Sequence, residues 1–218
     1  MSAAIRVRPR RELRAARRPR PHRCWGHLIA APLWPLHGAN LGTLLRTCDA
    51  VGACLAVPPF RWVDEALARG NTLRRPGCVH RVGSPLRWLA AERAAGSRVL
   101  GVELADEAVR LGDLPAARGR TVVLLGHEAT GIPPEALDQL DAAVEIPMVG
   151  HGHSLNVAVA GSLVLYKLAG SSSTAPGRRW INGDRAGEPH GRSGQPVPSR
   201  PGLPCESLVT ARASGHSR

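Results

Sequence analysis

The stretch TVVLLGHEATG, residues 121–131, holds the clearest strand signal of the sequence and a polar loop directly after it. Its first five residues are β-branched or apolar without polar alternation, which is typical of a strand buried on both faces of a parallel sheet. The loop that follows contains glycines, which let a backbone approach a ligand closely, and the carboxylate of Glu128. In parallel α/β sheets, ligands bind at the carboxyl ends of the strands. The segment after residue 125 is therefore a candidate site.

Short apolar runs alternate with helical patterns on both sides of this strand. We expect further strands at residues 28–31, 54–57, 79–82, 98–103 and 144–146. We expect helices from residue 40 onward and at residues 64–69, 86–95, 133–140 and 154–168. Asn40 and Ser154 stand at the start of two of these patterns, and both residue types commonly cap the N-terminus of a helix. The alternation predicts an α/β fold with a parallel sheet covered on both faces.

The net charge of +12 is carried by the two ends of the chain. Residues 1–23 hold nine arginines and one acidic residue, and residues 171–218 hold seven arginines and three acidic residues. Residues 24–170 hold thirteen basic and thirteen acidic residues. We therefore expect one neutral folded domain between a basic arm and a basic tail, both disordered. Such an arm attracts nucleic acid through the phosphates, although an arginine-rich end that only aids solubility fits the composition equally well.

The remaining composition argues against export, membrane insertion and metal binding. The sequence has no apolar signal-peptide core and no apolar run of the ~18 residues that would span a bilayer, so we expect a cytoplasmic protein. The cysteines are scattered, with no CxxC pair, at Cys24, Cys48, Cys54, Cys78 and Cys205. Neither a disulfide framework nor a zinc site is expected from that spacing. His151 and His153 share one loop, but no further ligand stands near them in sequence, and we expect no metal there.

Three loops that follow expected strands combine glycine with polar residues. They are residues 38–42, which lead into the helix that carries Arg46, residues 125–131, and residues 146–156. A glycine-rich turn after a strand is common, and each loop taken alone fits simple chain reversal as well as ligand binding. None of them matches the GxGxxG pattern or the P-loop with its lysine, which disfavours an ordinary dinucleotide or nucleoside triphosphate site.

Taken together, the three loops resemble the motifs of the SpoU (TrmH-like) family of RNA 2′-O-ribose methyltransferases, which belong to the SPOUT superfamily. The first motif is similar to Asn40-x-Gly42-x-x-x-Arg46-Thr47-Cys48, and the second to Leu125-Gly126-x-Glu128-x-x-Gly131. The third resembles Ile146-Pro147-Met148 followed by Ser154-Leu155-Asn156 and the apolar start of the last helix. The motifs occur in the family order, and the similarity covers about residues 28–169. Gly38 stands where many relatives have proline, which changes the stiffness of the loop but no reacting group.

This resemblance implies a fold, a cofactor and a site. The implied fold is a Rossmann-like parallel sheet with a deep trefoil knot at its C-terminal part, usually in a homodimer with the last helix at the interface. The implied cofactor is S-adenosyl-L-methionine. The residues that match cofactor-binding positions are Gly126, Ile146 and Leu155, with Leu125, Met148 and Gly150 beside them. The residues that match the catalytic positions are Arg46, Asn40, Glu128, Ser154 and Asn156.

The residue types suit transfer of a methyl group to a ribose 2′-hydroxyl. That hydroxyl is a poor nucleophile until its proton is lost or shared, so a base, or a cation that stabilises the forming alkoxide, is needed. A guanidinium is effectively always protonated, which favours electrostatic stabilisation, or a grip on the adjacent phosphate, as the role of Arg46. The alternative for Arg46 is a surface charge paired with Asp49 or Asp64. Glu128 is equally suited to organising its loop, and Ser154 or Asn156 to capping the last helix.

The sequence therefore predicts an S-adenosylmethionine-dependent methyltransferase that acts on a ribose 2′-hydroxyl of RNA, with transfer RNA as the first expectation and ribosomal RNA as the second. A non-catalytic RNA-binding protein of the same fold is the alternative. We expect no membrane association.

Overall fold

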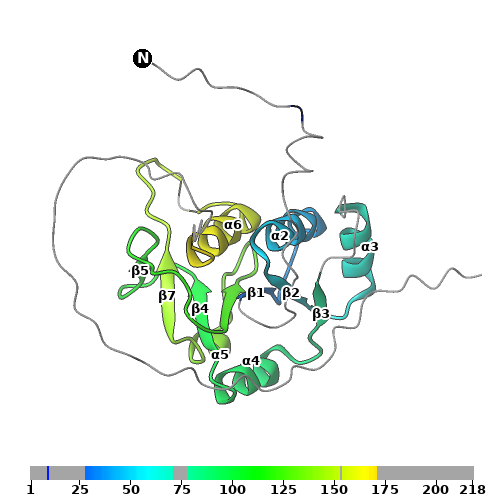
Figure 1. Cartoon of the computed structure of the whole chain (residues 1–218), viewed down its shortest axis with the longest axis horizontal. Coiled ribbons are helices and arrows are strands. Elements are labelled where there is room, and N and C mark those ends of the chain that lie inside the picture. Colours follow the sequence, from blue (N-terminus) through cyan, green and yellow to red (C-terminus); the bar gives the residue numbers. More distant parts are fainter. Residues whose placement is uncertain (1–8, 10–27, 71–77, 153, 171–218) are drawn as a thin grey trace, which may run out of the picture.

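The computed structural model describes residue 9 and residues 28–70, 78–152 and 154–170. The arginine-rich arm expected at residues 1–23, apart from residue 9, and the tail expected at residues 171–218 lie outside the described residues. The described residues form one sheet with helices on both of its faces (Figure 1).

The sheet has seven strands, and each of its strand pairs is parallel. The strands are β1 (Leu28–Pro32), β2 (Cys54–Val57), β3 (Val79–Arg81), β4 (Arg98–Val102), β5 (Val109–Arg110), β6 (Thr121–Leu125) and β7 (Ala142–Glu145). Their spatial order is β3-β2-β1-β6-β4-β7-β5. Strands β1 and β6 are fully buried along their length, as expected for the centre of a covered parallel sheet.

Two separate apolar layers hold the helices to the sheet. Figure 1 shows α2 (Gly38–Val51), α3 (Arg61–Gly70) and α6 (Val157–Leu168) on one face, and α4 (Pro85–Ala94) and α5 (Pro134–Leu137) on the other. Alternate residues of one strand supply both layers: Leu125 belongs to the cluster under α2 and α6, whereas Leu124 belongs to the cluster over α4 and α5. This is the period-two alternation of a strand that is buried on both sides.

Close helix packing on the first face depends on glycines that have almost no room for a side chain. A Cβ atom built on Gly42 of α2 would lie 2.7 Å from the Cα atom of Gly70, at the end of α3. A Cβ atom on Gly38 would lie 2.6 Å from the Cβ atom of Ala66. Gly38 and Gly42, both in the first of the three loops singled out in the sequence, therefore let two helices pack closely, rather than only opening a loop to a ligand.

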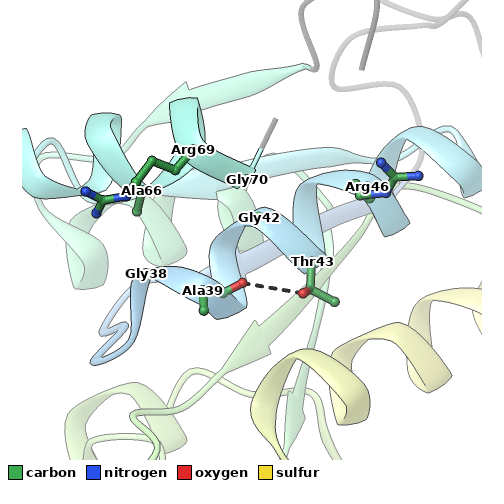
Figure 2. A pocket seen from close by; sticks show the side chains of 8 residues that line it. All are labelled: Gly38, Ala39, Gly42, Thr43, Arg46, Ala66, Arg69 and Gly70. Carbon is green, nitrogen blue, oxygen red and sulfur yellow. Dashed lines mark hydrogen bonds between the residues drawn. The ribbon is translucent and has the colours of Figure 1, made fainter. Parts of the chain in front are cut away.

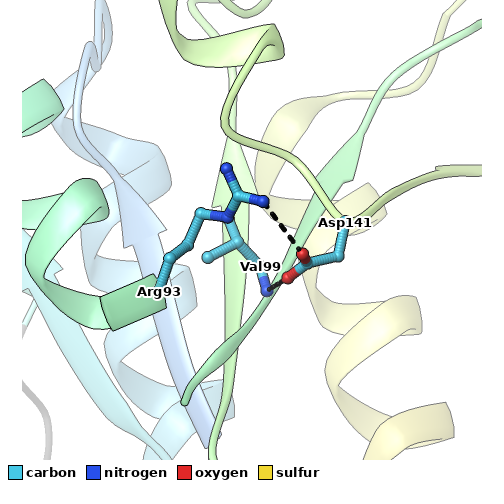
Figure 3. A network of polar contacts seen from close by, with 3 residues as sticks. All are labelled: Arg93, Val99 and Asp141. Atoms are coloured by element: carbon cyan, nitrogen blue, oxygen red, sulfur yellow. Dashed lines mark hydrogen bonds and ion pairs between the residues drawn. The ribbon is translucent and has the colours of Figure 1, made fainter. Parts of the chain in front are cut away.

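The amino-terminal edge of the sheet is fastened by one carboxylate, Asp141, which directly precedes β7. Its Oδ2 atom accepts a hydrogen bond from the backbone N–H of Val99 at 2.7 Å, and its Oδ1 atom lies 3.5 Å from the guanidinium of Arg93 (Figure 3). Because ligands bind at the opposite, carboxyl-terminal edge of such sheets, this network is structural.

Most of the expected elements are present, and two expectations are wrong. The expected parallel α/β sheet and six of its strands are confirmed; β5, which has only two residues, was not anticipated. Asn40 does not cap its helix, because α2 begins at Gly38 and Asn40 lies buried inside it. Ser154 does not cap the last helix either: Asn156 does, and its Oδ1 atom accepts from the N–H groups of Ala158 and Val159. No helix among the described residues is long and apolar enough to cross a membrane.

Candidate active site

The candidate site lies at the carboxyl-terminal edge of the sheet, where the strand order reverses. Residue Pro32 at the end of β1 is in register with Leu125 at the end of β6, so the loops that leave these two strands start side by side. From β1 the chain runs outward to β2 and β3, whereas β6 lies on the other side of β1, next to β4. Such a reversal leaves a crevice between loops, which is the usual ligand position in open α/β sheets.

Glu128, in the loop after β6, ties that loop to the loop after β1. Its Oε2 atom accepts from the backbone N–H of Leu36 at 2.8 Å, and its Oε1 atom accepts from the backbone N–H of His37 at 3.1 Å. The side-chain amide of Asn40 donates to the same Oε1 atom at 2.7 Å. Glu128 therefore has the loop-organising contacts that its position in the sequence allowed.

A directed chain of hydrogen bonds joins the three motifs. A carboxylate can only accept, so Asn40 must turn its NH₂ group toward Glu128 and its carbonyl oxygen away. That oxygen accepts from the NH₂ group of Asn156 at 3.0 Å, which leaves the carbonyl of Asn156 for the N-terminus of α6. Each amide orientation thus follows from the one before it. The structure brings together Glu128, Asn40 and Asn156, although Glu128 and Asn156 lie 88 and 116 residues after Asn40 in the chain.

The hydrogen bonds to Glu128 keep it ionised. Burial on its own would raise the pKa of this carboxyl, but the backbone N–H of Leu36, the amide of Asn40 and the N–H of His37 together lower the pKa below its ordinary value. A carboxylate with a lowered pKa holds a proton poorly, so Glu128 is suited to positioning rather than to proton abstraction.

Arg46 follows Asn40 on α2 and extends from the exposed side of the helix. Neither Asp49 nor Asp64 lies within ion-pair distance of it among the described residues, and Asp64 is paired with Arg81 instead. Arg46 lines a hollow of about 550 Å³ between α2 and α3, together with Thr43 and Arg69. Figure 2 shows the two arginines on either side of the contact between Gly42 and Gly70. Neither of the two expected ion pairs of Arg46 is present among the described residues, and its charge faces solvent beside the hollow.

The loop after β6 is a closed turn that needs two of its glycines. The backbone groups of His127 and Gly131 exchange two hydrogen bonds of 2.9 Å. A Cβ atom on Gly126 would lie 2.4 Å from the carbonyl carbon of Gly131, which itself has a φ of 72°. Glu103, after β4, accepts from the N–H of Ile132 at 3.0 Å and so anchors the far side of the turn. Sequence reasoning missed Glu103, because no motif marks the loop after β4.

The expected cofactor residues lie at the same sheet edge, at the ends of β6 and β7 and in the loops that follow. The side chain of Leu125 is buried in the core, so only its backbone faces the edge. Ile146 is half-buried, whereas Met148, Gly150 and Leu155 are exposed. The large apolar side chains of Met148 and Leu155 are therefore available to a ligand.

Ser154, the remaining residue that matched a catalytic position, takes no part in the hydrogen-bonded chain. Ser154 is exposed, and its hydroxyl has no hydrogen-bond partner among the described residues. His151 is also exposed, and His153 lies outside the described residues. The Oγ1 atom of Thr47 and the Oγ atom of Ser162 lie 2.8 Å apart and link α2 to α6.

The fold and this edge define a parallel α/β domain in which hydrogen bonds from Glu128 through Asn40 to Asn156 tie the loops of the carboxyl edge together. Residues 35–166 match the model of the SpoU rRNA Methylase family, and the chain belongs to that family. It is 35% identical over 133 residues to the tRNA (guanosine(18)-2′-O)-methyltransferase of Escherichia coli K12, a match that covers 59% of this chain and 56% of that protein. The chain thus spans little more than half the length of that relative.

Solved structures share the same fold. The AdoMet-bound rRNA methyltransferase from Sinorhizobium meliloti is 27% identical, with a TM-score of 0.55 over 65% of this chain and 54% of that chain. A structure described as giving insights into the 2-OH methylation of C/U34 on tRNA is 28% identical, with a TM-score of 0.57 over 65% of this chain and 94% of that chain. The described domain therefore corresponds to nearly the whole of one such protein.

Proposed function

We propose that this chain is an S-adenosylmethionine-dependent methyltransferase that acts on a ribose 2′-hydroxyl of RNA, with transfer RNA as the first substrate class and ribosomal RNA as the second. The observation that carries the proposal is the Glu128–Asn40–Asn156 chain, which joins the three family motifs at the carboxyl edge of the sheet. Arg46 is exposed further along α2, the helix that contains Asn40. The names of the E. coli and S. meliloti relatives support both substrate classes.

The residues at this edge fit S-adenosylmethionine. Backbone groups after Leu125 and Ile146 lie in the loops that follow β6 and β7 at this edge. The exposed side chains of Met148 and Leu155 offer apolar contacts to an adenine ring or a methionine chain. A Cβ atom added to Gly150 would meet nothing within 4 Å among the described residues, so this loop is open. When bound, the cofactor supplies a methyl group activated by a positive sulfonium. This chain's loops would hold and orient it.

Arg46 is proposed to act on the RNA. Its fixed positive charge would stabilise the alkoxide that forms as the ribose hydroxyl loses its proton, and its planar guanidinium suits a bidentate grip on the neighbouring phosphate. Its side chain is exposed beside the α2–α3 hollow and is accessible from solvent. Asn40, Glu128 and Asn156 would keep the surrounding loops in register, since their polar atoms already bind one another. Ser154 would contact the cofactor or RNA from the exposed loop.

The proposal extends to assembly, topology and location. Val159, Leu163 and Tyr166 are exposed apolar residues at helical spacing on α6, which supports a homodimer through this helix. After β7 the chain returns to pack α6 against α2 and β6. This return and the family membership support a C-terminal trefoil knot. We further propose a cytoplasmic protein whose catalytic domain spans residues 24–170, with a basic arm before it and a basic tail after it.

The first test measures methyl transfer by the full chain. Labelled S-adenosylmethionine and unmodified transfer RNA should give RNA that carries label on a ribose, whereas Arg46→Ala should lower transfer by at least about 100-fold, the scale of one lost oxyanion-stabilising group. Calorimetry should show that Arg46→Ala binds S-adenosylmethionine normally, because the cofactor loops lie elsewhere. Arg61→Ala is the matched control, since its side chain is 95% exposed on α3.

Two outcomes would contradict the proposal. A folded chain that binds no S-adenosylmethionine would remove the enzyme altogether. If the chain binds RNA without the cofactor and transfers no methyl group to either transfer RNA or ribosomal RNA, the non-catalytic protein of the same fold is favoured.

A further inference from the structure

Two cysteines and a histidine converge at a sheet position well separated from the candidate active site. The Sγ atom of Cys78 lies 3.1 Å from the Sγ atom of Cys54 and 3.1 Å from the Nε2 atom of His80. One ligand atom from each residue lies within 4.8 Å of the others. The two sulfur atoms are in thiol groups and are not joined in a disulfide. None of these residues belongs to the three family motifs.

The parallel register of two strands creates this cluster. Leu55 of β2 is paired with Val79 of β3, so the preceding residues, Cys54 and Cys78, stand side by side. His80 follows Cys78 by two positions and therefore shares its face of the sheet. Cys54 is the first residue of β2, and Cys78 immediately precedes β3. The cluster thus lies at the amino-terminal edge, whereas the candidate active site lies at the carboxyl-terminal edge.

We propose that Cys54, Cys78 and His80 form a binding site for a thiophilic divalent cation, with Zn²⁺ as its occupant. Two thiolates and an imidazole are the ligand types that Zn²⁺ prefers. In a tetrahedral zinc site, two sulfur ligands lie about 3.8 Å apart, and a sulfur and a nitrogen about 3.6 Å apart, given the usual bond lengths. The observed separations are shorter by well under 1 Å, a gap that small side-chain rotations cover. Binding would release the two thiol protons to solvent.

The burial of the three residues is graded in a way that suits an ion with an open position. Cys54 is 1% exposed, whereas Cys78 and His80 are half-buried. The ion would rest against the apolar layer on one side and take a water molecule as its fourth ligand on the other. It would also clamp β3, which has three residues and forms an edge of the sheet, to its neighbour β2. The proposal does not depend on the methyltransferase function.

Cys48 provides a matched control. It is as buried as Cys54, and its Sγ atom lies 3.5 Å from the backbone oxygen of Cys54. It nevertheless belongs to the opposite apolar layer, beneath α2. Because its side chain packs in the layer on the other side of the sheet from Cys54, Cys48 is not expected to bind the ion.

The test is a titration of the full chain with Co²⁺, a spectroscopic substitute for Zn²⁺. The protein is first reduced and treated with a chelator, and Cys24→Ser and Cys205→Ser remove two thiols outside the cluster. One equivalent of Co²⁺ should produce thiolate charge-transfer absorption and the visible bands of tetrahedral cobalt, and Zn²⁺ should abolish both. Saturating Zn²⁺, at about 100 times its Kd, should raise the thermal midpoint by roughly 5–10 °C.

The variants decide whether the cluster is the site. Cys78→Ser and His80→Gln should each weaken Co²⁺ binding at least about tenfold, as loss of a metal ligand or its support commonly does. Cys48→Ser should leave the spectrum unchanged. Because Cys54→Ser alters a fully buried position, circular dichroism must show that it folds before its spectrum is compared. His80→Gln, at a half-buried position, provides the second variant.

Three results would overturn the proposal. The first is the absence of cobalt bands in the reduced, folded chain. The second is a set of bands that survives both Cys78→Ser and His80→Gln. The third is a Cys54–Cys78 disulfide in the isolated protein, found by peptide mapping, together with a reduced form that binds no metal, since the pair would then be a redox couple.

Discussion

At the scale of single residues, the orientation of the Asn40 side-chain amide determines how the hydrogen bonds of the site are arranged. Asn40 is 7% exposed and uses both ends of its side chain, donating to Glu128 at 2.7 Å and accepting from Asn156 at 3.0 Å. No other residue type of this size offers a donor and an acceptor in that geometry: aspartate lacks the donor, and leucine lacks both. The motif asparagine is therefore explained by loop assembly, before any contact with a substrate is considered.

Glu128 gives a pH-dependent prediction at this scale. Its pKa lies below the ordinary value of 4.5 in the folded chain, so the folded state binds this proton less readily than the unfolded state. The stability that the ionised carboxylate contributes is therefore fully present above pH ~4.5 and is lost as the pH falls through the folded pKa. The wild type should be more stable than Glu128→Gln at pH ~7, and the difference in free energy of unfolding should shrink in the acid range.

Urea unfolding of both proteins across this range provides the measurement. The comparison cancels the carboxylates that the two proteins share. Glu107→Gln, at an exposed carboxylate without an ion pair among the described residues, should show no such change in the difference. A wild-type advantage that stays constant or widens toward low pH would refute the assignment of these hydrogen bonds to the ionised form.

The motif spacing selected Asn40, Glu128 and Asn156, and the fold brings these three side chains into one hydrogen-bonded chain. Their part in catalysis stays a prediction. The spacing did not show that Asn40 lies inside a helix, because asparagine at a pattern's start is equally typical of a cap. The Cys54, Cys78 and His80 cluster was missed for a related reason: the two cysteines lie 24 residues apart, and only the register of β2 and β3 brings them together.

At the scale of elements, the contact between α2 and α3 depends on missing side chains. Gly42→Ala should lower the free energy of unfolding by about 1–3 kcal/mol, the usual cost of overpacking. The new Cβ atom would lie 2.7 Å from the Cα atom of Gly70, and a backbone atom cannot rotate out of the way. The helices would have to separate and would change the hollow beside Arg46. Denaturant unfolding measures the first effect, and methyl transfer to RNA measures the second.

Gly83→Ala is the control for this prediction. A Cβ atom added at position 83 would enter open space among the described residues, and the φ of this glycine does not fall in the left-handed region. Its replacement should change stability by less than about 0.5 kcal/mol, as is usual for surface positions. If Gly42→Ala were as harmless as Gly83→Ala, the two helices would be less closely packed than the structure shows.

Element boundaries illustrate where periodicity fails as a predictor. Long apolar runs such as Thr121–Leu125 were predicted with their correct limits, because burial on both faces leaves a continuous apolar signal. The two residues of β5, Val109–Arg110, are too few to display any period, and this strand was missed. The start of α2 was placed two residues late because Gly38 is a poor helix former, and its presence there is explained by packing against Ala66.

At the scale of the whole molecule, the exposed face of α6 bears on assembly. Leu163→Glu combined with Tyr166→Glu should convert a dimer into a monomer in sedimentation experiments. Both side chains are solvent-exposed in a single chain, at 42% and 58%, so the charges should disrupt an interface rather than the core. Leu86→Glu, on α4 at the opposite face and 37% exposed, should leave the dimer intact. A wild-type monomer, or a dimer that survives the α6 charges, would place the interface elsewhere.

The distribution of charge leads to a prediction about RNA affinity. Residues 24–170 are balanced, so the excess positive charge resides in the two ends, and the first 23 residues alone carry a balance of +8. If this arm binds phosphates, each contact releases counterions, and the logarithm of the affinity falls with the logarithm of the salt concentration by about 0.7–0.9 for each contact. Replacing the nine arginines of residues 1–23 by glutamine in the full chain should make this slope shallower by several units and weaken RNA binding at low salt. Filter binding of transfer RNA at a series of salt concentrations measures both. The affinity for S-adenosylmethionine should stay unchanged, because the cofactor loops lie in the neutral domain. If the salt slope does not change, the arm serves solubility and the folded surface alone binds the RNA.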